Sequence, residues 1–372
     1  MPELKSIMPE PGRPLYLTVK DAVRGAIDQG HFAPGVRLPS TKALSVELSV
    51  SLVTVHRAMQ ELVASGVLRR GQGKGTYVHE SYGQTDRPGL GYRFGLAFHA
   101  ESSLADAYHG QILEGVRQGV DNLGADLVLL RFGEDWRKEC HGFLFVNPFE
   151  DQVVKIIRTF RSPRDESPRA IMVVGASFSL PGVHCIDSDN DGIGRSAARH
   201  FASLGHTRVG FVGGTGRVSN DRDRWNGFRD SCEELGLVLH PDHVFRQDGW
   251  KVDEAHGARL EAMLRSESRP TALFAGGYYF ALDVYSAAAA VGLRLPDQLS
   301  VIGVDDPPSA MHLSPSLTTF RQPLLKLGQM AAGSLLANVL DGDLGVGQRT
   351  VLQADLVERG SCAAVPGFSQ NA

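Results

Sequence analysis

Cysteines, long apolar runs and low-complexity stretches are all scarce in this chain of 372 residues. Its four cysteines form no Cys-x-x-Cys pair and have no histidine at zinc-finger spacing, so we expect reduced thiols and no metal site. The apolar runs are much shorter than the ~20 residues that cross a bilayer. The first residues are polar and lack the apolar segment of a signal peptide. We therefore expect a cytoplasmic protein with no membrane partner and no cofactor.

Acidic and basic residues are unevenly distributed along the chain. Residues 1–78 hold ten Lys or Arg and six Asp or Glu, a net charge of +4, whereas the other 294 residues hold 28 and 36, a net charge of −8. A basic segment ahead of an acidic one suggests that the first meets a polyanion and the second a different partner. The chain also exceeds the usual length of one domain, so more than one core is expected.

The first 78 residues have the pattern of three helices followed by a hairpin. Apolar residues recur every four positions from 15 to 29, which predicts the first helix. Ser40 and Ser51 stand where the N-caps of a second and a third helix are expected. Two short strands are predicted at 67–70 and 76–78, around a glycine-rich loop.

Short motifs in this segment resemble the winged-helix DNA-binding domain of GntR-type regulators. The motifs are Leu15-Tyr16, Gly30…Pro34-Gly35-x-x-Leu38-Pro39-Ser40, Val50-Ser51-x-x-Thr54-Val55 and Gly73-x-Gly75-Thr76-x-Val78. They occur in the order of the family and span nearly all of residues 14–78. In a helix-turn-helix unit the N-terminal part of the second helix enters the major groove. The resemblance therefore implies double-stranded operator DNA as the partner of this domain.

Two parts of the domain are expected to contact DNA. The helix after Ser51 has an apolar stripe from Val55 to Leu62, so its other side chains face outward. The residues assigned to DNA are Lys42, Ser51, Val53, Thr54, His56 and Arg57, with Lys74 and Gly75 in the wing. The family usually has Arg where Leu52 stands, and often Arg where His56 stands. Without these two cations, bidentate contacts to guanine are lost. Leu52 or Val53 could instead contact thymine methyl groups. A winged helix used only for protein contacts is the alternative.

Beyond a glycine-rich linker at 79–92, strand and helix patterns alternate. Near-continuous apolar segments, which predict buried parallel strands, occur at 93–98, 125–130, 142–146, 170–174, 209–212, 272–274 and 300–304. Amphipathic segments, which predict helices, occur at 111–123, 194–204, 224–235, 254–264 and 324–340. The alternation predicts an α/β fold with parallel sheets covered by helices, and its length suggests two similar lobes.

Four stretches of this region resemble the effector-binding domain of LacI/GalR-type regulators, itself similar to periplasmic sugar-binding proteins. They are Asp189-Asn190 with Leu204-Gly205-His206-x-Arg208, then Arg222-x-Arg224-x-x-Gly227-Phe228, then 270–274 with 299–306, and last 317–322 with 356–361. The resemblance implies a homodimeric, ligand-responsive repressor of carbohydrate metabolism, built like the hybrid arabinose-responsive repressors. It divides the chain into a winged helix-turn-helix domain (1–78), a linker (79–92), a two-lobed periplasmic-binding-protein-like body (93–362) and a tail (363–372).

The expected effector is a small sugar, held where strands end and helices begin. A guanidinium at Arg224, at the start of a helix, would donate to two hydroxyls, and Asp305, which ends a strand, would accept hydroxyl protons. Trp250 would stack on a sugar ring. The alternatives are a surface ion pair for Arg224 and Asp305 and a core aromatic for Trp250.

Other effector contacts are expected from both lobes. Ser102 and Asp106 follow the first strand of the body, and Gln322 ends one of the stretches that resemble the LacI/GalR family. Tyr278, with Gly277 before it, stands where that family usually has an Asn-Asp pair for the ligand. This departure leaves a nucleoside or another stacked ring open as the ligand. The segment between strands 125–130 and 142–146 is also shorter than in the family, so the first lobe is expected to be trimmed.

An enzyme or a small-molecule-binding protein that uses residues 210–228 is the alternative function. The stretch 210–216 follows a strand and precedes a helix, as a dinucleotide loop does. Its spacing is not G-x-G-x-x-G, and Asp221 and Asp223 at the helix start would repel a pyrophosphate. Residues 175–179 approach a nucleophile elbow but end in Ser where Gly is needed. We therefore expect no catalytic activity.

Overall fold

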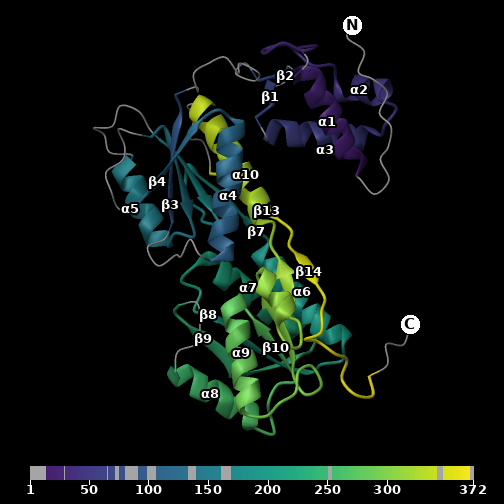
Figure 1. The fold of residues 1–372 in the computed structure, drawn as a ribbon, viewed down its shortest axis with the longest axis vertical. Coiled ribbons are helices and arrows are strands. Elements are labelled where there is room, and N and C mark those ends of the chain that lie inside the picture. The colour runs from purple at the N-terminus through teal and green to yellow at the C-terminus, as the bar shows by residue number, and fades with distance from the viewer. Residues whose placement is uncertain are drawn as a thin grey trace.

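The computed structural model describes residues 14–28, 30–64, 66–71, 75–79, 91–98, 106–132, 140–160, 169–249, 254–341 and 347–368. Within these ranges the chain forms a small N-terminal head and a body of two lobes. The lobes are stacked along the long axis, and the head lies beside the upper end of the first lobe (Figure 1). The head has a two-stranded sheet, and each lobe has a six-stranded sheet of its own. The predicted α/β body with two similar lobes is therefore confirmed.

The head contains the three helices and the hairpin that its sequence predicts. Ser40 accepts a hydrogen bond from the amide of Ala43 at 3.1 Å, and Ser51 accepts one from the amide of Thr54 at 3.1 Å, so both serines are N-caps. The apolar stripe of the third helix is fully buried in the core of the head. The elements are α1 (Leu15–Asp28), α2 (Thr41–Glu47), α3 (Leu52–Ala64), β1 (Leu68–Gly71) and β2 (Gly75–Val78).

The first lobe is a fully parallel sheet with the order β13-β7-β6-β5-β3-β4. Helix α10 packs beside α4 and against the sheet, although the two helices are far apart in the sequence (Figure 1). The strands are β3 (Arg93–Phe98), β4 (Asp126–Leu130), β5 (Gly142–Val146), β6 (Ala170–Val174), β7 (Val183–Ser188) and β13 (Arg349–Leu352). The helices are α4 (Ala107–Asn122), α5 (Glu150–Phe160) and α10 (Leu324–Asp341).

The second lobe has the order β14-β12-β11-β10-β8-β9, and its pairs are parallel except for β12 with β14. The strands are β8 (Arg208–Gly214), β9 (Val238–Gln247), β10 (Ala272–Ala275), β11 (Ser300–Val304), β12 (Thr318–Arg321) and β14 (Asp355–Val357). The helices are α6 (Asn190–Ser203), α7 (Ser219–Glu234), α8 (Glu254–Arg265), α9 (Tyr278–Ala290) and the short 3-10 helix η1 (Pro308–His312). None of the helices described here has both the length and the hydropathy needed to cross a bilayer.

Several elements were not predicted from the sequence pattern. They are β7, β9, β12, β13, β14, α5 and α9. Strands β9 and β14 lie at sheet edges and alternate or expose their side chains, so they contain no continuous apolar run. Helix α9 is apolar on nearly every side and so has no amphipathic period. The start of α7 was also predicted wrongly: the helix begins at Ser219, within a polar stretch, and Arg224 lies in its second turn rather than at its start.

The chain passes between the two lobes three times. The crossings are the short segments between β7 and α6, between β12 and α10, and between β14 and β13. The first and third crossings are joined, because Gln353 Nε2 donates to Asp189 Oδ2 at 2.8 Å. Parallel segments that cross at one place form a hinge, about which the lobes can rotate without unfolding.

Glycines allow two helix pairs to pack at close range. A Cβ added at Gly115 of α4 would overlap the carbonyl of Leu325 in α10. In the same way, a Cβ added at Gly194 of α6 would overlap the carbonyl of Arg224 in α7. The backbone of α7 at Arg224 is therefore fixed by direct contact with α6.

We expect Gly194→Ala to lower the free energy of unfolding by about 1–3 kcal/mol, because the added methyl group pushes α6 from α7. Gly257→Ala in α8 is the matched control, since nothing lies within 4 Å of its added Cβ. The control should be neutral or raise stability by up to ~1 kcal/mol, the difference in helix propensity. Urea unfolding measures both variants, and equal effects would contradict the close packing.

Candidate functional site

The cleft between the lobes lies where both sheets reverse their strand order. In the first lobe the reversal is between β3 and β5, and in the second it is between β8 and β10. Open α/β sheets bind ligands at the carboxyl ends of strands at such a point. A cavity of about 310 Å³ lies there, at the lower end of the ~300–1,000 Å³ range of ligand sites. Its polar and aromatic lining includes Asp106, Tyr108, Asn147, Asn220, Asp221, Arg224, Tyr278, Tyr279 and Asp305.

Arg224 is the cation of this cavity and is not a surface residue, since only 4% of it is exposed. Its Nε donates to Asn190 Oδ1 at 2.8 Å, and its Nη1 donates to the carbonyl of Gly276 at 2.7 Å. Among the described residues nothing accepts a hydrogen bond from Nη2. The guanidinium is thus held on one edge, and another edge is available to a ligand with hydroxyl or carbonyl oxygens.

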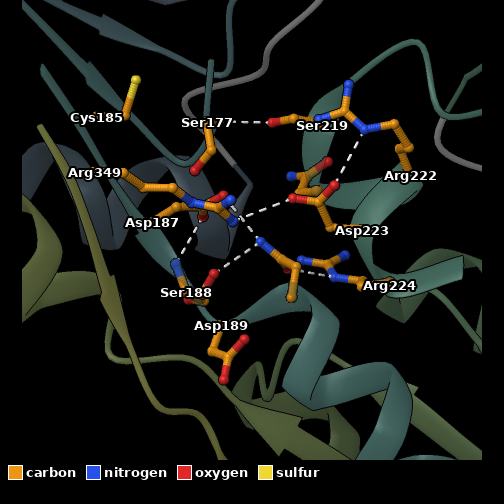
Figure 2. A network of polar contacts seen from close by, with 12 residues as sticks. Ser177, Cys185, Asp187, Ser188, Asp189, Ser219, Arg222, Asp223, Arg224 and Arg349 are labelled. Atoms are coloured by element: carbon orange, nitrogen blue, oxygen red, sulfur yellow. Dashed lines mark hydrogen bonds and ion pairs between the residues drawn. The ribbon is translucent and has the colours of Figure 1, made fainter. Parts of the chain in front are cut away.

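A buried polar network extends from Arg224 into the first lobe (Figure 2). Asn190, which accepts from Arg224, donates through Nδ2 to Asp187 Oδ2 at 2.9 Å. Asp187 is the next-to-last residue of β7, and its Oδ1 also accepts from the amide of Ser188 at 2.7 Å. Burial raises the pKa of Asp187 to about 7. The orientation of Arg224 is therefore set from the hinge, through Asn190.

The start of α7 is attached to the first lobe by further contacts (Figure 2). The amide of Ser177 donates to Ser219 Oγ at 2.8 Å, and Arg349 Nη2 lies 3.3 Å from Asp223 Oδ2. Val218 is the N-cap of α7 and has no capping side chain, so these contacts hold the helix end in place. The same helix contributes Arg224 to the cavity, which means that movement of the lobes displaces a cavity residue.

Asp305 lies directly after β11, with a left-handed backbone (φ 68°). Its Oδ1 accepts from Gln322 Nε2 at 2.5 Å. Burial raises the pKa of Asp305. Gln322 is behind Asp305 rather than in the cavity lining, so it orients the carboxylate.

The first lobe contributes Asp106, Tyr108 and Asn147 to the cavity. Asp106 is the N-cap of α4 and accepts from the amide of Tyr108 at 2.7 Å. The hydroxyl of Tyr108 donates to Asn147 Oδ1 at 3.4 Å. Asn147 was missed in the sequence, although it directly follows a predicted strand, the signal that identified Asp305. Two predicted contacts, Ser102 and Trp250, lie outside the described residues.

Asp221 was considered in the sequence only as a charge that would repel a pyrophosphate. The structure places it in the cavity wall, in the first turn of α7. No hydrogen bond or ion pair reaches its carboxylate from the part of the chain that the structure describes. Burial raises its pKa to about 6. A half-buried carboxylate that receives no hydrogen bond from the described residues points to a ligand that supplies hydrogen-bond donors.

We expect Asp221→Asn to raise stability near neutral pH. The folded-state pKa is about 6 and the ordinary value is 3.8, so between these values the folded chain binds more protons than the unfolded one. The stability contribution of Asp221 therefore falls as pH rises from about 4 to about 6. Urea unfolding at pH 4 to 8 should show a variant whose advantage grows over this window, with exposed Asp230→Asn on α7 as control. An advantage that is the same at every pH would contradict the assignment.

The outer face of α3 has the exposure that a DNA-reading surface needs. Leu52 and Val53 are 53% and 77% exposed, and His56 is also exposed. Thr54 Oγ1 lies 2.7 Å from Ser51 Oγ, so the cap fixes both hydroxyls. Lys42 of α2 is exposed as well, whereas Lys74 of the wing lies outside the described residues.

Two other residues assigned to DNA make contacts within the protein. The guanidinium of Arg57 stacks on the ring of Tyr16 at 4.0 Å. Both line a cavity of about 910 Å³ between head and body, which also includes Gln322. A Cβ added at Gly75, whose φ is +112°, would lie 2.6 Å from Arg37 Nε. Glu61 of α3 pairs with Lys326 of α10 at 3.7 Å across this boundary.

Comparison with known proteins gives a family-model match for two stretches of the chain. Residues 15–78 match the family of bacterial regulatory proteins of the gntR type, and residues 198–362 match the periplasmic binding protein-like domain. The fold of the head and that of the two-lobed body agree with these two matches. The chain thus joins a head similar to GntR-type regulators to a body whose larger part is similar to the periplasmic binding protein-like domain.

Relatives and solved structures agree with this assignment. The HTH-type transcriptional repressor PurR of Haemophilus influenzae (strain PittEE) is 32% identical over 48% of this chain and 53% of its own length. PurR of Klebsiella pneumoniae subsp. pneumoniae is 28% identical over 72% of this chain and 79% of its own length. The chain spans about half the length of the first of these relatives. They are repressors, which agrees with the expectation that the chain is not an enzyme.

Solved structures share the fold of the body. The lac repressor dimer bound to operator and the anti-inducer ONPF is 22% identical, with a TM-score of 0.63 over 73% of this chain and 94% of that one. The complex of the transcriptional regulator CelR with cellobiose is 20% identical, with a TM-score of 0.63, and the match covers 87% of this chain and 100% of that one. At this identity the likeness concerns the fold alone.

Proposed function

We propose that this chain is a ligand-responsive, DNA-binding transcription regulator, a dimeric cytoplasmic repressor of carbohydrate-metabolism genes. The observation that carries the proposal is the combination of an exposed α3 face on a GntR-type head with a cavity at both strand-order reversals of the body. One recognition helix reads only a few base pairs, so two copies on a palindromic operator supply the missing specificity.

A small sugar is the effector that the cavity chemistry favours. Asp221 and Asp305 are acceptors for hydroxyl donors, and Arg224 offers donors to hydroxyl oxygens. Tyr278 and Tyr279 add aromatic surface on which a ring can stack. The relative CelR, whose complex contains cellobiose, supports the same class of ligand.

Lobe closure is the step that would transmit effector binding. Asp106 and Asn147 belong to the first lobe, and Arg224 and Asp305 belong to the second, so only a closed cleft contacts the ligand from both sides. Closure about the three crossings changes the spacing of the two heads in a dimer. The glycine-rich linker at 79–92 transmits such changes weakly, so we expect a coupling free energy of ~1–3 kcal/mol.

Arg224→Ala should abolish the effector response while operator affinity without effector stays within about two-fold of the original. The effector response is lost because the variant removes the guanidinium that Asn190 and Gly276 hold in the cavity. Loss of a buried charged donor typically lowers the binding free energy by ~2–5 kcal/mol. Arg229→Ala, exposed on the same helix, is the control. Fluorescence anisotropy of a labelled promoter fragment, with and without sugar, measures both effects. Lost operator binding with the response retained would refute this site.

Operator binding should weaken steeply with salt, because phosphate contacts release counterions. Lys74→Gln should weaken binding to all sequences and reduce the salt slope by about 1, whereas Thr54→Val should change which sequence is preferred. Anisotropy titrations against a panel of operator variants test this, and sedimentation should give two chains per operator. If both variants lose affinity equally for all operator sequences, the roles given to Lys74 and Thr54 are wrong. If one chain binds each operator, the proposed dimer is wrong.

A further inference from the structure

A second cavity adjoins the effector cavity, and Asp221 lines both. It measures about 240 Å³ and is lined by residues of both lobes, among them Phe149, Thr215, Arg217 and Asp248. Phe149 follows β5 in the first lobe, and Arg217 follows β8 in the second. The second cavity is therefore part of the same interlobe cleft, beyond the carboxylate of Asp221.

Asp221 is held between the cavities by the shape of the backbone. A side chain at Gly214, the last residue of β8, would overlap its carboxylate, so glycine provides the space that the carboxylate occupies. The amide of Asp221 donates to Asn220 Oδ1 at 2.8 Å, which fixes the turn. The carboxylate oxygens receive no hydrogen bond from the described residues, and they lie within reach of a molecule in either cavity.

The second cavity is suited to an uncharged ring with hydroxyl groups. The guanidinium of Arg217 stacks on the ring of Phe149 at 3.9 Å, which provides a flat surface spanning the two lobes. Thr215 donates its hydroxyl to Asp248, so that side of the cavity offers oxygen acceptors. The carboxylates of Asp221 and Asp248 line the space with one guanidinium, that of Arg217, so the net charge of the lining is negative and disfavours a phosphate or carboxylate group there.

We propose that the two cavities form one bipartite site, and that the effector is an uncharged disaccharide whose rings lie on either side of Asp221. One ring occupies the cavity of Arg224 and Asp305, and the other lies against Arg217 and Phe149. Asp221 accepts hydroxyl protons from both rings. This inference rests on the proposed function, because it names the class of ligand that the same cleft takes.

Calorimetric titration of the full chain tests the proposal with neutral disaccharides, their constituent monosaccharides and the corresponding sugar 6-phosphates. At least one disaccharide should bind ten-fold or more tightly than either constituent, and the phosphates should bind more weakly than the neutral sugars. Asp221→Asn and Thr215→Trp, which fills the second cavity, should reduce the ratio of disaccharide to monosaccharide affinity to about one. Asp230→Asn on the outer face of α7 should keep the original ratio.

Three results would overturn the bipartite site. They are a monosaccharide or phosphate that binds as tightly as any disaccharide, a panel in which no disaccharide binds, and an affinity ratio that Thr215→Trp leaves intact. Operator anisotropy in the same samples separates this from the proposed function. A disaccharide that binds the cleft without changing operator affinity refutes the proposed function and not the bipartite site. A sugar that changes operator affinity, in a panel where no disaccharide binds more tightly than its constituents, refutes only the bipartite site.

Discussion

The buried guanidinium of Arg224 is the constraint on which the body depends. A cation removed from water is stable only where acceptors surround it, and here the acceptors come from α6 and from the turn after β10. Asn190 in turn requires Asp187 at the end of β7, in the other lobe. One side chain therefore fixes the separation of α6 and α7, the position of the hinge and the shape of the cavity. The glycine at 194 is a consequence of the same constraint, because α7 must lie close enough for Arg224 to reach Asn190.

Much of the head could be predicted from the sequence, because its determinants are local. Ser40 and Ser51 act on amides three residues away, and the stripe of α3 repeats every turn. Arg224 and Asp305 were also found, since a strand end or a family motif marks each of them. Asn147 follows a predicted strand and so had the same mark, but it was overlooked. Asp221 had no such mark, because its place in the cavity depends on neighbours distant in the chain. Gln322 was predicted as an effector contact, and the structure places it behind Asp305, which only the pairing of β11 with β12 brings near.

In the described residues, an ion pair and a cavity mark the boundary between head and body. Lys326 and Glu61 form an exposed pair, of a kind that contributes less than ~1 kcal/mol, and a large cavity separates the facing helices. Gln322 is at this boundary and also holds Asp305, so one side chain borders both the effector cleft and the space beside α3. A head held this loosely changes position at small energetic cost, which agrees with a modest coupling between the sites.

The three crossings also determine the order in which the protein can assemble during synthesis. Helix α10 and strand β13 complete the first lobe, yet they emerge from the ribosome after nearly all of the second lobe. The head has its own core within residues 15–78 and needs nothing that follows. A growing chain thus carries a folded head while the first lobe is unfinished, with Phe94 and Leu144 lacking the α10 side chains that cover them. Nascent chains should therefore present a complete head before the cleft between the lobes exists.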